Sequence, residues 1–312
     1  MSGHQVGVRL PSYGSFSYSP AETIVLDLNG DGRDDVLLAY TYVGDMPQSV
    51  PLRVLLSTGS GFRDGTQEVF GGTVSADGPG GFALADFNGD GRKDVFLANS
   101  GMDRGNFPGA PETLLLSTGS GLREASVNVP PENSYTHSIT YGDIDRDGDI
   151  DVFLGNLTAP WISGATAGPM VLLNNGAGQF SADASRLPGI STTANGYTAS
   201  AFADTDQDGD LDLVLGGFQD GVKSRILVND GTGRFSEGAV LPDRPNPTAE
   251  ADAVTDIIVQ DLNGDGRADL ILNVAGDGYR AEPSRWDAAC PDGGQHQARA
   301  APPRGCGPSS PP

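Results

Sequence analysis

One nine-residue pattern occurs five times in this chain of 312 residues and restricts its fold more than any other feature. Asp or Asn occupies the first, third and fifth places, Gly the sixth and Asp the ninth. The copies begin at Asp27, Asp86, Asp143, Asp204 and Asp261, so that successive starts are 57 to 61 residues apart. This regular spacing indicates that the chain is built from repeats of one supersecondary unit.

The side chains of this pattern are those that bind a hard cation. Ca²⁺ takes about six to eight oxygen ligands at roughly 2.3–2.6 Å, and the glycine permits a sharp turn of the backbone around it. We therefore predict up to five bound Ca²⁺ ions, one for each loop. In each loop we expect the side chains at the first, third, fifth and ninth places to be ligands, together with the backbone carbonyl at the seventh place. The residues are Asp27, Asn29, Asp31, Arg33 and Asp35; Asp86, Asn88, Asp90, Arg92 and Asp94; Asp143, Asp145, Asp147, Asp149 and Asp151; Asp204, Asp206, Asp208, Asp210 and Asp212; and Asp261, Asn263, Asp265, Arg267 and Asp269.

Two other kinds of loop could in principle carry such residues. A helix–loop–helix calcium site requires Glu at the twelfth place, whereas here that place holds Leu in every copy, for example Leu38 and Leu97. The loops could also be ordinary polar turns, since Asp and Gly are common in turns. Five copies at one spacing favour the metal sites over both alternatives.

The net charge of −22 agrees with this reading. Nearly half of the 41 acidic residues stand in the five loops, and each bound Ca²⁺ would cancel two negative charges. Nucleic acid is therefore excluded as an expected partner, because it is bound by basic surfaces. The chain also lacks an apolar run of the length that spans a membrane.

Short apolar stretches lie before and after each loop, such as Phe82–Ala85 and Val95–Leu97, and they predict buried strands. After each of the first four loops comes a second hairpin with two glycines in its turn, as in Leu114–Leu122. Four antiparallel strands per repeat are typical of a β-propeller blade. The sequence therefore predicts an all-β fold, a β-propeller with about five blades visible, or seven if the chain is incomplete.

The two ends of the chain are expected to complete one blade together. The loop at Asp261 has no second hairpin after it, and a hairpin at residues 6–18 has no loop before it. We therefore predict one propeller domain over residues 1–275, closed by both terminal segments. Residues 276–312 are rich in Pro, Gly, Ala and Arg and are predicted to form a disordered tail, which holds Cys290 and Cys306, the chain's only cysteines.

The stretch Gly81–Leu97, which joins one such loop to its flanking strands, resembles the FG-GAP/VCBS repeats of integrin α-subunit propellers and of many secreted bacterial proteins. The resemblance covers residues 6 to 275. It implies calcium loops on one face of a propeller, most often seven-bladed, used for adhesion or ligand recognition.

The expected location is extracellular or periplasmic, because calcium sites of this kind usually fill where calcium is near millimolar. The N-terminal residues Met1–Gln5 show no apolar core of a signal peptide. A monomer that binds an extracellular protein or glycan ligand is the expected functional form.

The longer connections at the end opposite the metal loops are the predicted ligand face, since binding residues concentrate in loops on a rigid scaffold. Their candidate contact residues are Tyr135, His137, Trp161 and Tyr197. Two alternatives remain open. One is a polysaccharide-acting enzyme, a lyase or hydrolase, in which His137 and Tyr135 act as an acid/base pair. The other is a structural spacer within a larger surface protein.

Overall fold

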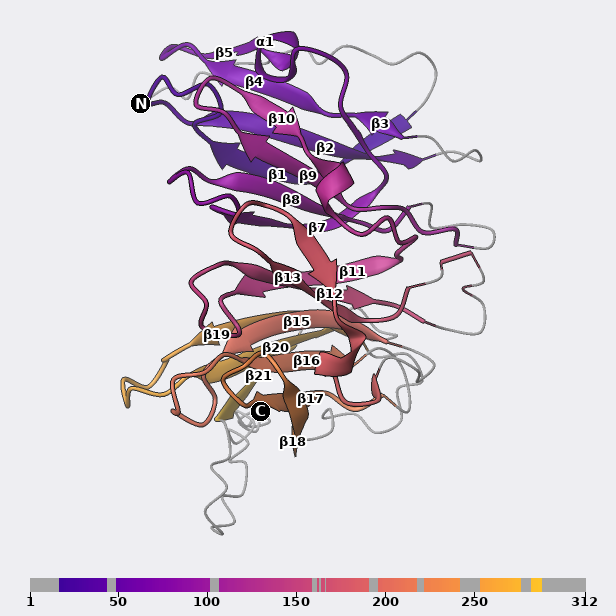
Figure 1. Cartoon of the computed structure of the whole chain (residues 1–312), viewed down its shortest axis with the longest axis vertical. Helices are drawn as coiled ribbons and strands as arrows, with labels where there is room; N and C mark the ends of the chain where they lie inside the picture. Colours follow the sequence, from indigo (N-terminus) through magenta and orange to yellow (C-terminus); the bar gives the residue numbers. More distant parts are fainter. Residues whose placement is uncertain are drawn as a thin grey trace, which may run out of the picture.

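The computed structural model describes residues 17–43, 49–101, 107–158, 162, 164–165, 167–190, 196–217, 222–241, 253–275 and 282–287. These residues form an all-β structure in which four sheets have four antiparallel strands each, as the sequence predicted. The sheets follow one another along the long axis of the molecule in chain order (Figure 1).

Each sheet comes from one sequence repeat. The first has the order β1-β2-β4-β5 (Ser17–Leu26, Asp35–Val43, Arg53–Ser57, Phe62–Asp64), the second β10-β9-β8-β7 (Leu122–Glu124, Thr113–Ser117, Asp94–Asn99, Pro79–Ala85), the third β11-β12-β13-β14 (Thr136–Gly142, Asp151–Asn156, Met170–Asn174, Phe180–Ala182) and the fourth β15-β16-β17-β18 (Tyr197–Ala203, Asp212–Gly217, Arg225–Asn229, Phe235–Val240). A fifth sheet contains β19, β20 and β21 (Ala253–Gln260, Asp269–Ala275, Glu282–Asp287), and a small sheet pairs β3 with β6 (Val50–Pro51, Ser75–Ala76). The helical segments are α1, η1 and η2 (Thr66–Phe70, Ser126–Asn128, Ala184–Arg186).

Neighbouring sheets pack face to face through apolar side chains. Leu37 and Val54 of the first sheet share a buried cluster with Leu97 and Leu115 of the second. Similar clusters join the second sheet to the third, the third to the fourth and the fourth to the fifth. Burying one such side chain stabilises the fold by about 1.5–3 kcal/mol, which is why the apolar runs beside the loops predicted strands buried on both faces.

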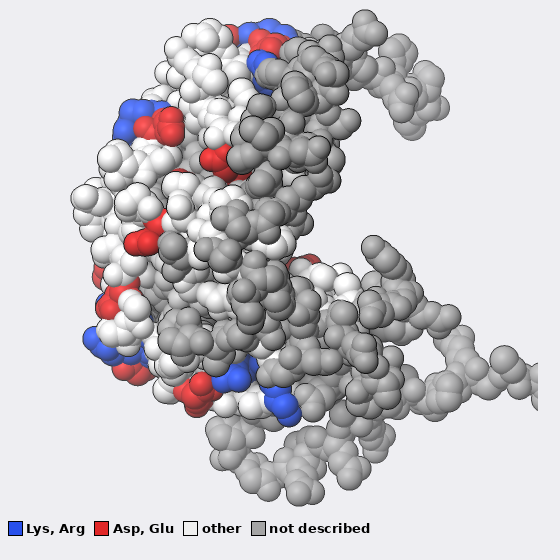
Figure 2. Space-filling view, turned by 90° about the vertical axis from the view of Figure 1, so that its right-hand side faces the viewer, with Lys and Arg blue, Asp and Glu red and all other residues white. Residues whose placement is uncertain are grey.

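The first strands of successive sheets, β1, β7, β11, β15 and β19, lie side by side and form the inner edge of the stack. The described part of the chain follows an arc, with its convex side on the left in Figure 2. Each of these strands contains a bulge at the same place, six residues before the metal loop. The unpaired residues are Ala21, Gly80, His137, Thr198 and Thr255. A bulge of this kind bends and twists a strand.

The predicted closure by both termini stays a prediction, because most of the hairpin at residues 6–18 lies outside the described part of the chain. Ser17 and Tyr18 extend β1 and pair with β2, because the bulge beyond Pro20 lets the edge strand continue past a residue without an amide proton. On the side of β20 away from β19, the neighbouring strand is β21, whose six residues come from the predicted tail. Residues 1–16 lie outside the described residues.

The helical segments of the described chain have three to five residues, and none has the length and apolar character needed to cross a bilayer.

Candidate metal centres

Each predicted metal loop connects the first two strands of its sheet. In the antiparallel order β1-β2-β4-β5, the loop after β1 and the hairpin turn after β4 must lie at the same end. That end is the left-hand side of the molecule in Figure 1. The remaining connections emerge at the opposite end, as the sequence predicted.

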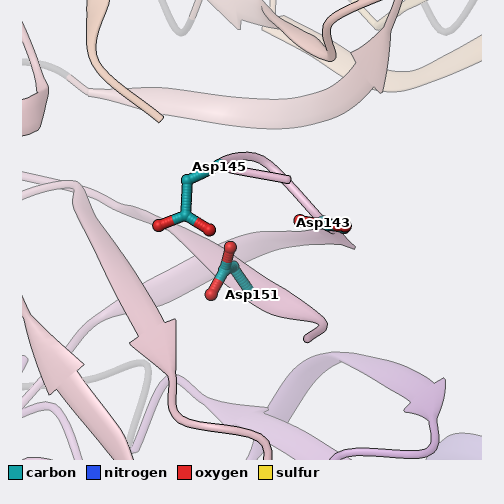
Figure 3. A group of neighbouring side chains, drawn as sticks. All are labelled: Asp143, Asp145 and Asp151. Carbon is teal, nitrogen blue, oxygen red and sulfur yellow. The ribbon is translucent and has the colours of Figure 1, made fainter. Parts of the chain in front are cut away.

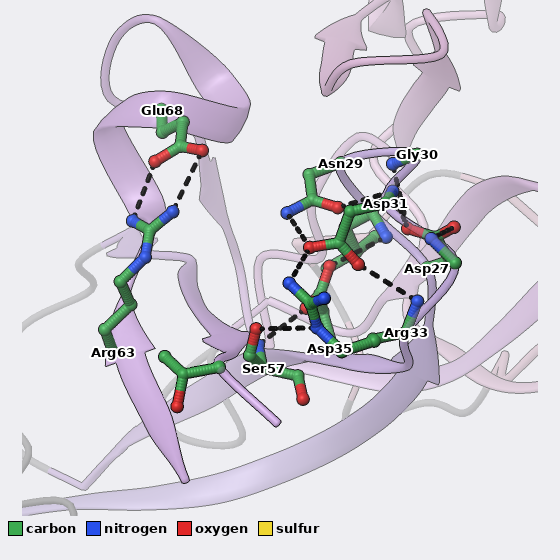
Figure 4. Close-up of polar contacts among 12 residues, drawn as sticks. Asp27, Asn29, Gly30, Asp31, Arg33, Asp35, Ser57, Arg63 and Glu68 are labelled. Atoms are coloured by element: carbon green, nitrogen blue, oxygen red, sulfur yellow. Dashed lines mark hydrogen bonds and ion pairs between the residues drawn. The ribbon is translucent and has the colours of Figure 1, made fainter. Parts of the chain in front are cut away.

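The first-place aspartate organises the loop backbone (Figure 4). Asp27 Oδ1 accepts the amide hydrogen of Gly30 at 2.8 Å, and its Oδ2 accepts that of Gly32 at 2.8 Å. The second of these hydrogen bonds is present in all five loops, at distances from 2.7 to 3.2 Å. The sixth-place glycines have φ between 82° and 93°, a conformation that other residues adopt only with strain. The repeated sequence therefore encodes a repeated loop geometry.

The ninth-place aspartate connects the loop to the third strand of its sheet through hydrogen bonds. Asp94 is fully buried, and its two carboxylate oxygens accept the amide hydrogens of Phe87 at 2.9 Å and Ser117 at 2.7 Å. Asp35, Asp151 and Asp212 make the equivalent pair of hydrogen bonds. This structural role was not foreseen from the sequence. It leaves ligation possible, because each carboxylate oxygen has a second lone pair.

The third loop brings three of its carboxylates together. Oxygens of Asp143, Asp145 and Asp151 lie within 4.8 Å of one another, and Asp145 and Asp151 turn toward each other in Figure 3. One buried oxygen of Asp143 and one of Asp145 have no hydrogen-bond partner among the described residues. A buried anionic oxygen without a partner is unfavourable. The residues therefore fit a Ca²⁺ ion, which would supply the missing interaction.

In the fourth loop Asp204, Asp206 and Asp208 form a comparable group. In the first two loops the guanidinium groups of the seventh-place arginines pair with the fifth-place carboxylates, Arg33 with Asp31 at 2.5 Å and Arg92 with Asp90 at 3.4 Å. In the third loop Arg186 lies 3.6 Å from a carboxylate oxygen of Asp145. These arginines compete with a cation for the same oxygens.

We expect the third and fourth loops to bind calcium more tightly than the first, second and fifth. The weaker three have a neutral Asn at the third place and an Arg at the seventh, and ligand charge sets the affinity of such sites. In calorimetric titrations, Asp143→Ala should abolish a high-affinity step, whereas Asp86→Ala should abolish only a weak one. Equal affinities for the two steps would contradict this ranking.

Burial leaves several of the predicted ligand carboxyls hard to ionise without a cation. It raises the pKa of Asp151 to about 7 and that of Asp94 to about 6, although hydrogen bonds from backbone amides oppose the shift. Burial is also the main cause of the raised pKa of Asp145 and of Asp212, and neighbouring loop carboxylates add to it. The ion-free loops therefore hold protons that a cation would displace.

Calcium is expected to stabilise the fold more at about pH 8 than at about pH 5, because protons and calcium compete for these carboxyls. Without calcium, the folded pKa values of Asp94 and Asp151 exceed the ordinary value of 3.8, so their contribution to stability is lost as the pH rises through about 6 to 7. Thermal unfolding of calcium-free and calcium-loaded protein across this range measures the difference. A calcium-induced increase in Tm that shrinks with rising pH would contradict the expectation.

The predicted ligand-face residues have different surroundings. Tyr135 and Tyr197 are 4% and 1% exposed, so their rings cap the sheet ends inside the protein, which corrects the expectation that they lie open to a ligand. His137 is half-buried at its bulge, with its ring 4.7 Å from that of Tyr135. Trp161 lies outside the described residues.

Glu112 is a buried acid that sequence reasoning missed. Its side chain joins the second sheet to the third, because Oε2 accepts the amide hydrogen of Asn99 at 2.5 Å and Oε1 lies 2.8 Å from Thr136 Oγ1. Thr136 Oγ1 is also 2.7 Å from Asn156 Oδ1. A hydroxyl has one proton, so both contacts are hydrogen bonds only when Glu112 is protonated and donates to Thr136. Burial accordingly raises the pKa of Glu112 to about 8.

Comparison with solved structures finds similarity to the rhamnogalacturonan lyase YesW, with a TM-score of 0.47 and 17% identity over 88% of this chain and 50% of that one. The exotype rhamnogalacturonan lyase YesX gives 0.43 and 15% over 84% and 48%. The chain thus spans about half the length of these structures. The search of curated proteins gives no match.

The FG-GAP-like repeat family model matches residues 27–97 and 204–272. Each match runs from the first-place aspartate of one loop through the whole next loop to the strand after it, and so contains the geometry described above. This confirms the resemblance seen in Gly81–Leu97: the chain contains FG-GAP-like repeats in these two regions.

Proposed function

We propose that this chain is a calcium-binding β-propeller module that acts outside the cytosol in ligand recognition or adhesion. The five sheets that hold three or four strands are the blades, and Ca²⁺ held by the five loops fixes one end of each blade. The observation that carries the proposal is the third loop, where buried carboxylate oxygens of Asp143 and Asp145 lie beside Asp151 without hydrogen-bond partners among the described residues. When bound, Ca²⁺ supplies positive charge and up to about eight coordination positions.

The recognition surface in this proposal is the end opposite the loops. There the connections between strands vary in length and sequence from sheet to sheet, while the metal loops repeat. Figure 2 shows this face, where acidic side chains are scattered over the described surface, some of them beside Lys or Arg. A protein or glycan could therefore bind there without displacing calcium, and a monomer suffices for this function.

The test is a binding screen on glycan and protein arrays with calcium-loaded protein, together with an assay for polysaccharide cleavage. Specific binding that weakens after calcium removal supports the proposal. Turnover of a polysaccharide would indicate an enzyme instead. Loss of all binding in both states would leave the chain as a structural spacer, contrary to the proposal.

A further inference from the structure

The third and fourth metal loops are joined by a buried asparagine. Asn229, the last residue of β17, is 3% exposed. Its Nδ2 donates to the carbonyl of Ile144 at 2.8 Å and to that of Leu211 at 3.1 Å. Ile144 belongs to the third loop and Leu211 to the fourth. One side-chain amide therefore contacts the backbone of both loops.

The contact points lie next to the predicted ligands. Ile144 stands between Asp143 and Asp145, and Leu211 stands between Asp210 and Asp212. The backbone amide of Asn229 also donates to Asp212 Oδ1 at 2.9 Å, so the residue holds a ninth-place carboxylate directly. Its Oδ1 accepts the amide hydrogens of Gly231 and Gly233, which fixes the orientation of the side chain.

A second link between the two loops is an arginine. Arg146 holds the fourth place of the third loop with φ at 61°, where three of the other loops have glycine. Its guanidinium contacts the carboxylate of Asp210 and lies 3.4 Å from the carbonyl of Asp208. Both acceptors are residues of the fourth loop.

We propose that these links couple the third and fourth loops, so that calcium in either loop raises the calcium affinity of the other. This inference rests on the proposed calcium-binding function. Calcium in one loop fixes its backbone, and through Asn229 it also restricts the backbone beside the ligands of the other. The second ion then binds a loop that is already ordered, which gives positive cooperativity without a large structural change. Linkage makes the effect equal in both directions.

The residues at the position of Asn229 in the second and third sheets show where this amide link is present and where it is missing. Asn174 occupies the equivalent position in the third sheet and donates to the carbonyl of Phe87 in the second loop at 2.8 Å. In the second sheet the position is Ser117, whose buried hydroxyl has no partner among the described residues. The first and second loops therefore lack the amide link that joins the second to the third and the third to the fourth.

The experiment is a double-mutant cycle on the full chain, read by calorimetric calcium titration. Asp208→Ala empties the fourth loop, and the affinity of the third loop is measured with and without Asn229→Ser, the residue that Ser117 supplies naturally. In the Asn229 background, Asp208→Ala is expected to lower the calcium affinity of the third loop by about tenfold. In the Asn229→Ser background it should lower that affinity by less than half of this factor. The control is Asp31→Ala, which alters the unlinked first loop and should leave the calcium affinity of the third loop unchanged.

Arg146→Gly provides a second variant, because glycine fits the positive φ and should preserve folding. It is expected to reduce the coupling while keeping or raising Tm. An unchanged third-loop affinity after Asp208→Ala would overturn the coupling, as would an undiminished effect in both the Asn229→Ser and Arg146→Gly backgrounds. If the wild-type chain binds no calcium at all, the proposed function itself is wrong. If the loops bind calcium but do so independently, only the coupling is wrong.

Discussion

Asp94→Ala is expected to lower the free energy of unfolding by roughly 2–5 kcal/mol whether or not calcium is present, because it leaves two buried amide hydrogens without acceptors. These hydrogens belong to Phe87 and Ser117, and both now bond to the Asp94 carboxylate. Denaturant unfolding in calcium and in a chelator measures the loss in each condition.

The matched control is Asp90→Ala in the same loop. Asp90 is the fifth-place residue and is exposed, so its removal should affect stability mainly in the presence of calcium. The comparison separates a carboxylate that holds the fold from one whose main task is to bind the ion. Equal losses for the two variants in chelator would show that Asp94 has no separate structural role.

Glu112→Gln is expected to make the protein more stable than the wild type above about pH 8. The wild-type pKa in the folded state, about 8, exceeds the ordinary value of 4.5, so stability from the protonated carboxyl is complete below about pH 4.5 and is lost as the pH rises through about 8. A glutamine amide can accept from Asn99 and donate to Thr136 at every pH, which removes this loss.

The measurement is the free energy of unfolding of both proteins between about pH 5 and pH 9. Glu112→Ala serves as the control, because it leaves the amide of Asn99 and the hydroxyl of Thr136 without their partner and should be destabilised by roughly 2–4 kcal/mol across the range. Parallel pH profiles for the wild type and Glu112→Gln would contradict a protonated Glu112.

The sequence predicted the repeating units well because their signals are local. An aspartate-rich loop between two apolar runs, as around Asp90, specifies two strands and the turn that joins them. The paired glycines after each third strand specify the second hairpin, as at Gly119 and Gly121. Loop geometry, strand order and the all-β class all follow from such short segments.

Features that depend on contacts between distant segments were not predictable in the same way. The amide of Ser117 meets Asp94 only after the third strand has paired, and Glu112 meets Thr136 only after two sheets have packed. Tyr135 and Tyr197 show the same limit, since an aromatic residue before a strand can either face solvent or cap the sheet. The pairing of β21 with β20 likewise depends on the packed fold rather than on the composition of the tail.

The most direct measurement is thermal unfolding of the full chain, with and without a calcium chelator, on protein whose metal content has been determined. Calcium at a hundredfold excess over Kd should add about 2.7 kcal/mol for each independent site that binds only the folded state. The account predicts several bound Ca²⁺ per chain and a Tm that falls clearly on chelation. Purified protein that contains no calcium and unfolds at the same temperature with calcium as in the chelator would contradict it.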